Sequence, residues 1–336
     1  MKKVLPAAFF FLILLLLFPD ICVEGAKSGL LLWFNTIIPT LFPFILITNI
    51  VRDLGGIPLL ERIFSPLISR LFKTGAGGAY PVVLGFLCGY PMGAKAVADS
   101  LSCRRISQKE ATYLLSFTNN PSPIYMISYV AIFTLNAPGM KLPVMIIACL
   151  TSIITAFIFR CFFYKSPRSS RAPVKPKAWP FSGRLSALSL KAKPSPSIFS
   201  KTEGTLNTAP KPSQSFFDRS IISAFELLVK VGGYMILFSI LAGCLTQIPW
   251  LPPIIACLLC GLLEQTTGLG LLKVQAFSLE IKTVLAMAMI CFGGLSITAQ
   301  TYSVIHSQGL SIKPYLFSKL LSGLIAAALA AVWLSC

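Results

Sequence analysis

Residues 85 to 99 read GFLCGYPMGAKAVAD, and this stretch decides how the chain can fold. Three glycines and a proline interrupt an apolar run here, and a lysine and an aspartate follow. Lipid cannot satisfy the backbone groups that such a break leaves free, so the break must face protein or a water-filled cavity. Broken helices of this kind form binding sites in membranes. The stretch therefore predicts an internal polar site in a membrane protein.

The composition of the whole chain supports this class. Apolar residues make up 55% of the 336 residues, charged residues make up 12%, and the mean hydropathy is +0.78. A soluble domain carries about 25% charged residues. We therefore predict an all-α polytopic membrane protein, because helices satisfy their own backbone hydrogen bonds in lipid.

The net charge of +18 is unevenly distributed. Eleven of the 29 lysines and arginines lie between Lys165 and Arg219, against two acids, Glu203 and Asp218. The same segment holds eight prolines and eleven serines, which is typical of a solvated linker. The positive-inside rule places it in the cytoplasm beside anionic lipids, so nucleic acid is not an expected partner.

Sequence signatures of catalysis and metal binding are missing. Most of the ten cysteines lie in apolar runs, only Cys257 and Cys260 have metal-ligand spacing, and His306 is the sole histidine. There is no glycine-rich phosphate loop and no Ser, His and Asp set. We expect no metal, no cofactor and no enzymatic activity.

The N-terminal segment, residues 1–28, has two interpretations. A basic start and an apolar run to Phe18 fit either a signal peptide or a short first spanning helix. Residues 29–51 are predicted to span the membrane. Residues 56–72 carry arginines among large apolar residues and predict an amphipathic helix at the membrane interface.

The opening motif belongs to a segment, residues 79–101, with basic residues on both flanks. The positive-inside rule then places both ends in the cytoplasm and predicts a re-entrant hairpin rather than a single crossing. Residues 111–135 run outward and contain NNPSP at 119–123, so this helix is expected to be unwound at membrane depth. Residues 143–163 return to the cytoplasm.

The pattern recurs after the linker. Residues 220–336 contain a spanning run, then LCG followed by EQTTGLG at 264–270, then FGGLSITAQ at 292–300. These stand where the first half, residues 29–164, has its hairpin tip and its NNPSP break. A count of the predicted membrane crossings places the start of the first repeat outside and the start of the second inside, so the two repeats have inverted orientations. Inverted repeats of this kind form a site near the membrane midplane, where they meet.

Two charged residues are candidates for that site. Lys95 would offer a positive charge, with the backbone N–H groups of Gly93 and Ala94, to a carboxylate, or it would extend to the lipid headgroups. Glu264 would bind a coupling cation or proton, or pair with Lys95. Tyr90 would stack on a flat ring or anchor the chain at the interface.

The remaining candidates offer uncharged hydrogen bonds. Each could bind substrate, or could satisfy backbone groups freed by the glycines and prolines. They lie at the predicted breaks and are Asn119, Asn120, Ser122, Gln265, Thr266, Thr267, Ser296 and Gln300.

Four motifs carry a resemblance to a known family. They are GFLCGYPMGAK at 85–95, SFTNNPSP at 116–123, GLLEQTTG at 261–268 and CFGGLS at 291–296. With them the chain resembles the nucleoside-recognition or Gate domain membrane proteins, and within these the YlbJ-like sporulation integral membrane proteins of endospore-forming bacteria. The resemblance covers residues 29–336 apart from the linker.

The resemblance implies a relative of concentrative nucleoside transporters that acts in the mother cell during spore formation. The implied substrate is a small anion, dipicolinic acid, and the implied location is the outer forespore membrane. Two alternatives are a nucleoside transporter and a non-transporting membrane scaffold. The sequence does not determine the identity of the coupling ion, nor whether the protein acts as a single chain or as a homo-oligomer.

Overall fold

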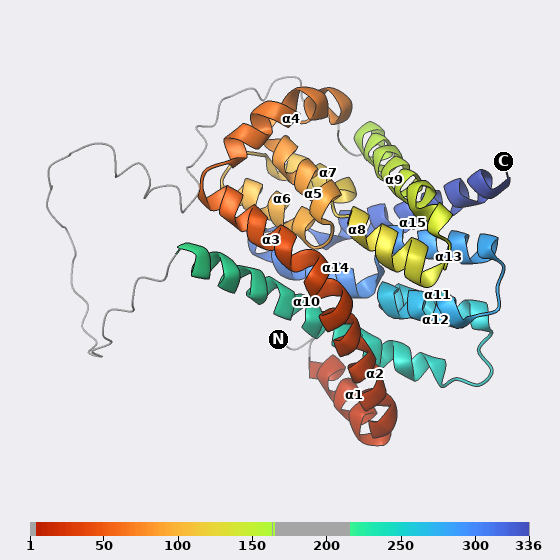
Figure 1. Cartoon of the computed structure of the whole chain (residues 1–336). Coiled ribbons are helices and arrows are strands. Elements are labelled where there is room, and N and C mark those ends of the chain that lie inside the picture. Colours follow the sequence, from red (N-terminus) through yellow and green to blue (C-terminus); the bar gives the residue numbers. More distant parts are fainter. Residues whose placement is uncertain (1–4, 163, 165–215, 336) are drawn as a thin grey trace, which may run out of the picture.

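The computed structural model describes residues 5–162, 164 and 216–335, and these parts of the chain are helical without a strand. The all-α prediction is therefore confirmed. Figure 1 shows the arrangement of the helices. The predicted linker lies outside the described residues, except for residues 216–219, which begin helix α10.

Five described helical segments are long and apolar enough to cross a membrane, which confirms the polytopic class. A sixth arises if α4 and α5, which are bent by 99° relative to each other, count as one broken span. The five segments are Pro19–Asp53, Pro138–Phe162, Phe217–Thr246, Leu279–Gln308 and Ile312–Ser335.

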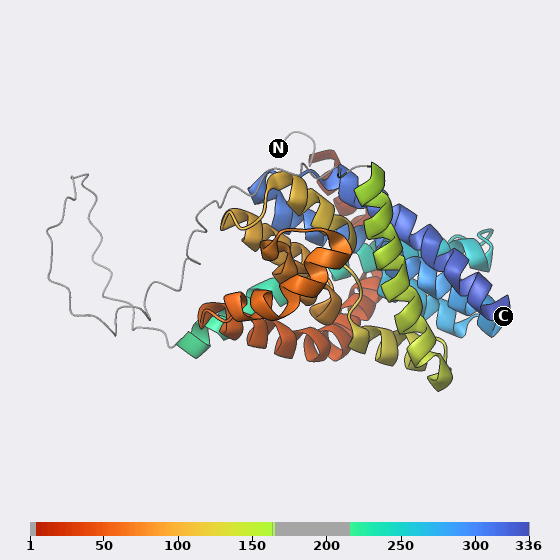
Figure 2. The ribbon, with the colours of Figure 1, turned by 90° about the horizontal axis from the view of Figure 1, so that it is seen from above.

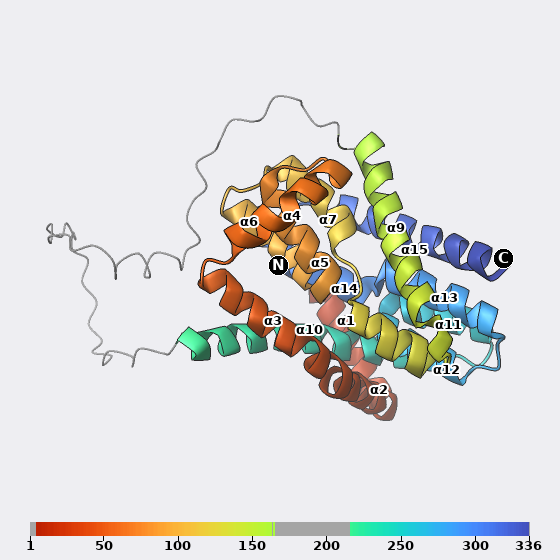
Figure 3. The ribbon, with the colours of Figure 1, turned by 45° about the horizontal axis from the view of Figure 1, so that its top comes forward.

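The chain begins with α1 (Leu5–Leu17), and a long helix follows it. This helix consists of α2 (Pro19–Leu32), a π-helical segment η1 (Trp33–Ile37) and α3 (Ile38–Asp53). The predicted span 29–51 is thus the later part of one helix. It packs along α10 (Phe216–Thr246), and Figure 3 shows α3 and α10 side by side.

The first hairpin follows α4 (Ile57–Phe72) and the short η2 (Ala76–Gly78). It consists of α5 (Ala79–Cys88) and α6 (Met92–Ser102), which pack against each other. The chain reverses at Gly89, whose φ of 78° is a conformation that favours glycine. The predicted break is present, and re-entry into a membrane stays a prediction.

The first broken helix comes next in the chain. Helix α7 (Gln108–Thr118) ends at an irregular segment, residues 119–122. The chain then resumes as α8 (Pro123–Tyr125) and the π-helical η3 (Met126–Thr134). This interruption is where the two asparagines and two prolines predict it, since proline lacks an amide hydrogen. After η4 (Pro138–Met140), α9 (Lys141–Phe162) completes this half.

The second half repeats the order of elements after α10. A hairpin of α11 (Pro253–Leu263) and α12 (Gln265–Val274) reverses at Glu264. A broken helix of α13 (Leu279–Phe292) and α14 (Gly294–Ile305) is interrupted at Gly293, whose φ is 88°. The short η7 (His306–Gln308) and the long α15 (Ile312–Ser335) end the chain.

The hairpin of each half packs against the broken helix of the other half. Helix α6 of the first hairpin packs on α14 of the second broken helix, and α12 of the second hairpin packs on η3 of the first. Helix α15 lies along α13 and also contacts α9, which is visible from above in Figure 2. All four breaks are thereby brought to the interior of the bundle. The inverted orientation of the halves stays a prediction.

Candidate functional site

A small cavity lies where the breaks meet. Its volume is about 40 Å³, and both hairpins, both broken helices, α3 and α10 contribute to its wall. Six of the predicted site residues line it, namely Tyr90, Ser122, Glu264, Gln265, Thr266 and Gln300. Thr40 and Tyr125 add polar groups, and the apolar lining comes from Ile37, Leu41, Val231, Met235 and Ile297. The wall thus combines apolar surface with convergent polar groups, as ligand sites do.

The two hairpin tips touch in this region. The hydroxyl of Tyr90 lies 3.4 Å from Oε1 of Gln265 and also donates to the carbonyl of Ile290, in the last turn of α13. Gly293 lies against the same ring, because a Cβ there would be 3.6 Å from the Tyr90 hydroxyl. Tyr90 therefore connects the first hairpin to the second hairpin and to the second broken helix.

Glu264 is 2% exposed and begins α12. Its Oε2 accepts hydrogen bonds from the backbone N–H of Thr267 at 2.7 Å and from the Thr267 hydroxyl at 3.0 Å. A carboxylate at this position is stabilised by the positive end of the helix dipole. Lys95 pairs with Asp99 and not with Glu264. The negative charge of Glu264 is instead stabilised by the N-terminus of α12, the helix that it caps.

Two tyrosines of the first broken helix reach the second hairpin. The hydroxyl of Tyr125 lies 3.4 Å from Oγ1 of Thr266, and the hydroxyl of Tyr129 donates to the Thr266 carbonyl at 3.1 Å. Thr267 faces α10, where its hydroxyl is 2.9 Å from that of Ser239. Thr266 therefore belongs to the cavity wall, and Thr267 to the packing behind it.

Asn119 joins the first broken helix to the second. Its Nδ2 donates to Oγ1 of Thr301 and to the hydroxyl of Tyr315, both at 2.9 Å. Its Oδ1 accepts from the backbone N–H of Ala94 at 3.3 Å, so that N–H group, predicted to face a substrate, already has a partner.

Asn120 contacts a lysine that sequence reasoning missed. Its Oδ1 accepts a hydrogen bond from Nζ of Lys319 at 3.1 Å, and its Nδ2 donates to the carbonyl of Phe117. Lys319 is fully buried in α15. A lysine within a 24-residue apolar helix is itself a signal for a functional residue, and that signal could have identified it.

The other predicted residues have packing or local roles. Gly93 lies against the end of α7, where a methyl group would overlap the Thr118 carbonyl. Ser122 accepts from the N–H of Tyr125 and so begins α8. Ser296 accepts from Nε2 of Gln300 at 3.2 Å, which orients that amide in the cavity wall.

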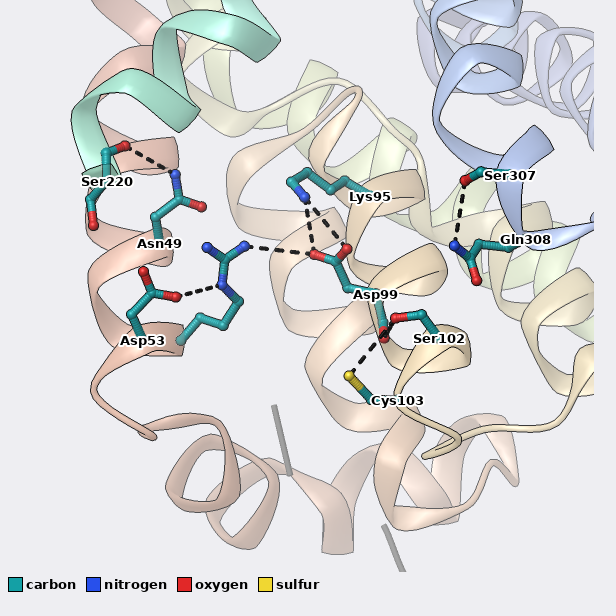
Figure 4. Close-up of polar contacts among 10 residues, drawn as sticks. Asn49, Asp53, Lys95, Asp99, Ser102, Cys103, Ser220, Ser307 and Gln308 are labelled. Carbon is teal, nitrogen blue, oxygen red and sulfur yellow. Dashed lines mark hydrogen bonds and ion pairs between the residues drawn. The ribbon is translucent and has the colours of Figure 1, made fainter. Parts of the chain in front are cut away.

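Lys95 lies outside the cavity. Its Nζ is 3.2 Å from Oδ2 of Asp99 on the same helix, and Asp99 is also 3.9 Å from Arg52, which pairs with Asp53. Figure 4 shows Lys95 turned toward Asp99, with Asp53 on the neighbouring helix α3. The Lys95 side chain is 23% exposed, so it belongs to a charge cluster between α3 and α6.

A second, wider cleft adjoins the cavity. Its volume is about 580 Å³, and it shares Thr40 with the cavity wall. Both π-helical segments line it, η1 through Asn35 and Thr36 and η3 through residues 128, 129 and 133. π-Helical turns occur frequently at functional sites.

This arrangement defines a class of protein. Its fold is an α-helical bundle with several candidate membrane spans, in which two hairpins and two broken helices line a small cavity that carries several polar groups. Among the described residues, no group of three or more His, Cys, Asp or Glu side chains is placed to hold a metal ion. The polar groups of the cavity can bind a small solute by hydrogen bonds.

Comparison with known proteins supports this class. The chain is 25% identical over 330 residues to the sporulation integral membrane protein YlbJ of Bacillus subtilis strain 168. The aligned region covers 92% of this chain and 76% of YlbJ. The YlbJ-like assignment that the four motifs predict is thereby confirmed, and the chain is an integral membrane protein. No protein-family profile matches the chain. No solved structure matches it either.

Proposed function

We propose that this protein transports a small carboxylate across a membrane during spore formation, and that dipicolinic acid is the substrate. The proposed location is the outer forespore membrane, where the protein would move the substrate out of the mother cell. The observation that carries the proposal is the cavity, because two hairpin tips and two broken helices converge on it inside an apolar bundle. The similarity to the sporulation integral membrane protein YlbJ supports this context.

The chemistry of the cavity suits a flat, polar ring. Tyr90 and Tyr125 contribute aromatic rings to the wall, and Ser122, Gln265 and Thr266 contribute groups that can form hydrogen bonds. Aromatic rings pack by offset stacking, and hydroxyl and amide groups can bind carboxylate oxygens. A pyridine dicarboxylate presents both features to such a wall.

The size of the cavity indicates a closed conformation. A protein cavity that binds benzene measures about 150 Å³, so a substituted pyridine needs more room than the 40 Å³ present. Transport therefore requires the hairpin tips to separate at the contact between Tyr90 and Gln265. The wider cleft next to Thr40 is the proposed route of access.

The test is flux in proteoliposomes that contain this protein alone. Vesicles loaded with Tb³⁺ report entry of dipicolinate by luminescence, with protein-free vesicles as the control. We expect entry that saturates with dipicolinate concentration and resists competition by nucleosides. Competition by a nucleoside would favour a nucleoside transporter. Absence of flux for both substrates would favour a membrane scaffold.

A further inference from the structure

In the part of the chain that the structure describes, Lys319 forms no ion pair with a carboxylate. The side chain is fully buried, and among the described residues no Asp or Glu oxygen lies within 4.0 Å of its ammonium group. It donates a hydrogen bond to Asn120, and the centroids of the Tyr90 and Tyr315 rings lie 5.7 and 5.9 Å from it. An unpaired buried ammonium is costly, so other groups must stabilise it.

The negative end of α7 is one such group. Asn120 is the second residue after this helix, donates to the carbonyl of Phe117 in its last turn, and accepts from Lys319 through its other amide atom. The amide of Asn120 thus connects the ammonium to the C-terminal carbonyls of α7. A cation is favoured at the C-terminus of a helix.

The negative end of α13 is the second group that can stabilise the Lys319 ammonium. Helix α15 packs along α13 so closely that a Cβ on Gly323, one turn beyond Lys319, would be 3.2 Å from Cβ of Phe292, the last residue of α13. Tyr90, beside Lys319, caps the carbonyl of Ile290 in the same last turn. Each helix end carries a partial negative charge, and both ends therefore favour a cation nearby.

We propose that Lys319 is a built-in cation that replaces the sodium ion of other broken-helix transporters, so that transport by this protein needs no Na⁺. Such transporters hold Na⁺ at the carbonyl ends of interrupted helices, and the amide of Asn120 links the Lys319 ammonium to the carbonyl end of α7. The inference rests on the proposed transport function and adds the coupling property of the same site. Lys319 does not line the cavity, so it is not the group that binds the substrate anion.

The first experiment uses the unaltered protein. Dipicolinate flux into proteoliposomes is measured with Na⁺ and with choline at equal ionic strength, and the melting temperature of the purified protein is measured in the same two salts. We expect no difference in either quantity. A flux that rises severalfold with Na⁺, or a melting temperature that Na⁺ raises, would overturn the inference. The melting measurement holds even if the protein transports no dipicolinate.

The second experiment removes the cation. Lys319→Met fills the space without a charge, and we expect flux to fall by about 10-fold or more, which is the loss of one charged contact. Lys319→Ala leaves room at the carbonyl ends, and we expect added Na⁺ or K⁺ to restore part of its flux. Lys313→Met, an exposed lysine on the same helix, is the matched control and should be unaffected.

The outcomes separate the two proposals. If the unaltered protein moves no dipicolinate in any salt, the transport function fails and the melting measurement alone decides the inference. If it moves dipicolinate and Lys319→Met does so equally well, the transport function stands and the built-in cation is wrong.

Discussion

The hydroxyl of Tyr90 lies 3.4 Å from Oε1 of Gln265, which joins the tip of one hairpin to the tip of the other across 175 residues of chain. The same hydroxyl caps the carbonyl of Ile290 at the end of α13. One side chain thus joins the two hairpins and the second broken helix. This relationship makes Tyr90 a direct probe of the closed conformation.

The Tyr90→Phe variant should fold and insert into the membrane. We expect it to be less stable than the unaltered protein and to show a changed rate of dipicolinate flux. Removing the hydroxyl leaves a buried carbonyl without its partner, which costs about 1 to 3 kcal/mol. We expect a lower melting temperature together with altered dipicolinate flux, measured in detergent and in proteoliposomes. The control is Tyr302→Phe, because the Tyr302 side chain is exposed. Unchanged stability and flux in Tyr90→Phe would mean that this contact does not hold the closed state.

Two substitutions at Glu264 separate its charge from its capping role. Glu264→Gln keeps an oxygen that can accept from the N–H of Thr267, whereas Glu264→Ala removes the cap at a cost of about 1 kcal/mol. We expect both variants to lose most flux and only Glu264→Ala to lose stability. Glu280→Gln, at an exposed helix start, serves as the control. Normal flux in Glu264→Gln would limit this residue to a structural role.

Gly85→Ala should prevent folding or insertion. A methyl group there would overlap the carbonyl of Thr118, at the end of α7, so α5 could not approach the first broken helix. Overpacking of this kind costs about 1 to 3 kcal/mol or more. Gly139→Ala is the control, because no atom lies within 4 Å of a Cβ at that position. The amount of protein in the membrane fraction measures the difference, and equal amounts would contradict the close approach.

Lys95→Met should affect transport far less than Lys319→Met. Its ion pair with Asp99 is partly exposed, and such pairs are worth about 1 kcal/mol or less. We therefore expect dipicolinate flux to fall by less than about fivefold. A nearly complete loss of flux in correctly inserted protein would instead place Lys95 on the substrate path, as its position after the hairpin tip suggests.

The topology of the chain is open to direct measurement. The basic linker, residues 165–219, is predicted to be cytoplasmic, and Cys336 is predicted to lie on the opposite side of the membrane. Single cysteines placed in the linker and at the C-terminus can be labelled with a maleimide that does not cross the membrane. Labelling of both positions from the same side would remove the argument for inverted repeats.

The positions of the breaks could be predicted from the sequence because their causes are local. Gly89 and Gly293 adopt positive φ angles, and the asparagines and prolines at 119–123 end one helix and begin another. Each interruption follows from the backbone freedom of glycine or the missing amide hydrogen of proline. The candidates taken from these breaks accordingly supply six side chains of the cavity wall.

The partners of the charged side chains were decided only by the tertiary structure. Lys95 follows a predicted break, yet the direction in which it leaves α6 takes it to Asp99 and the α3 face. Lys319 meets Asn120 although 199 residues separate them, because α15 packs along α13 at the point where α7 ends. Such contacts depend on how helices far apart in the sequence pack together, and no local pattern of residue types encodes that packing. The sequence by itself determined the class, the breaks and most of the polar side chains of the cavity wall. Helix packing decided which buried charged side chain lies beside the breaks.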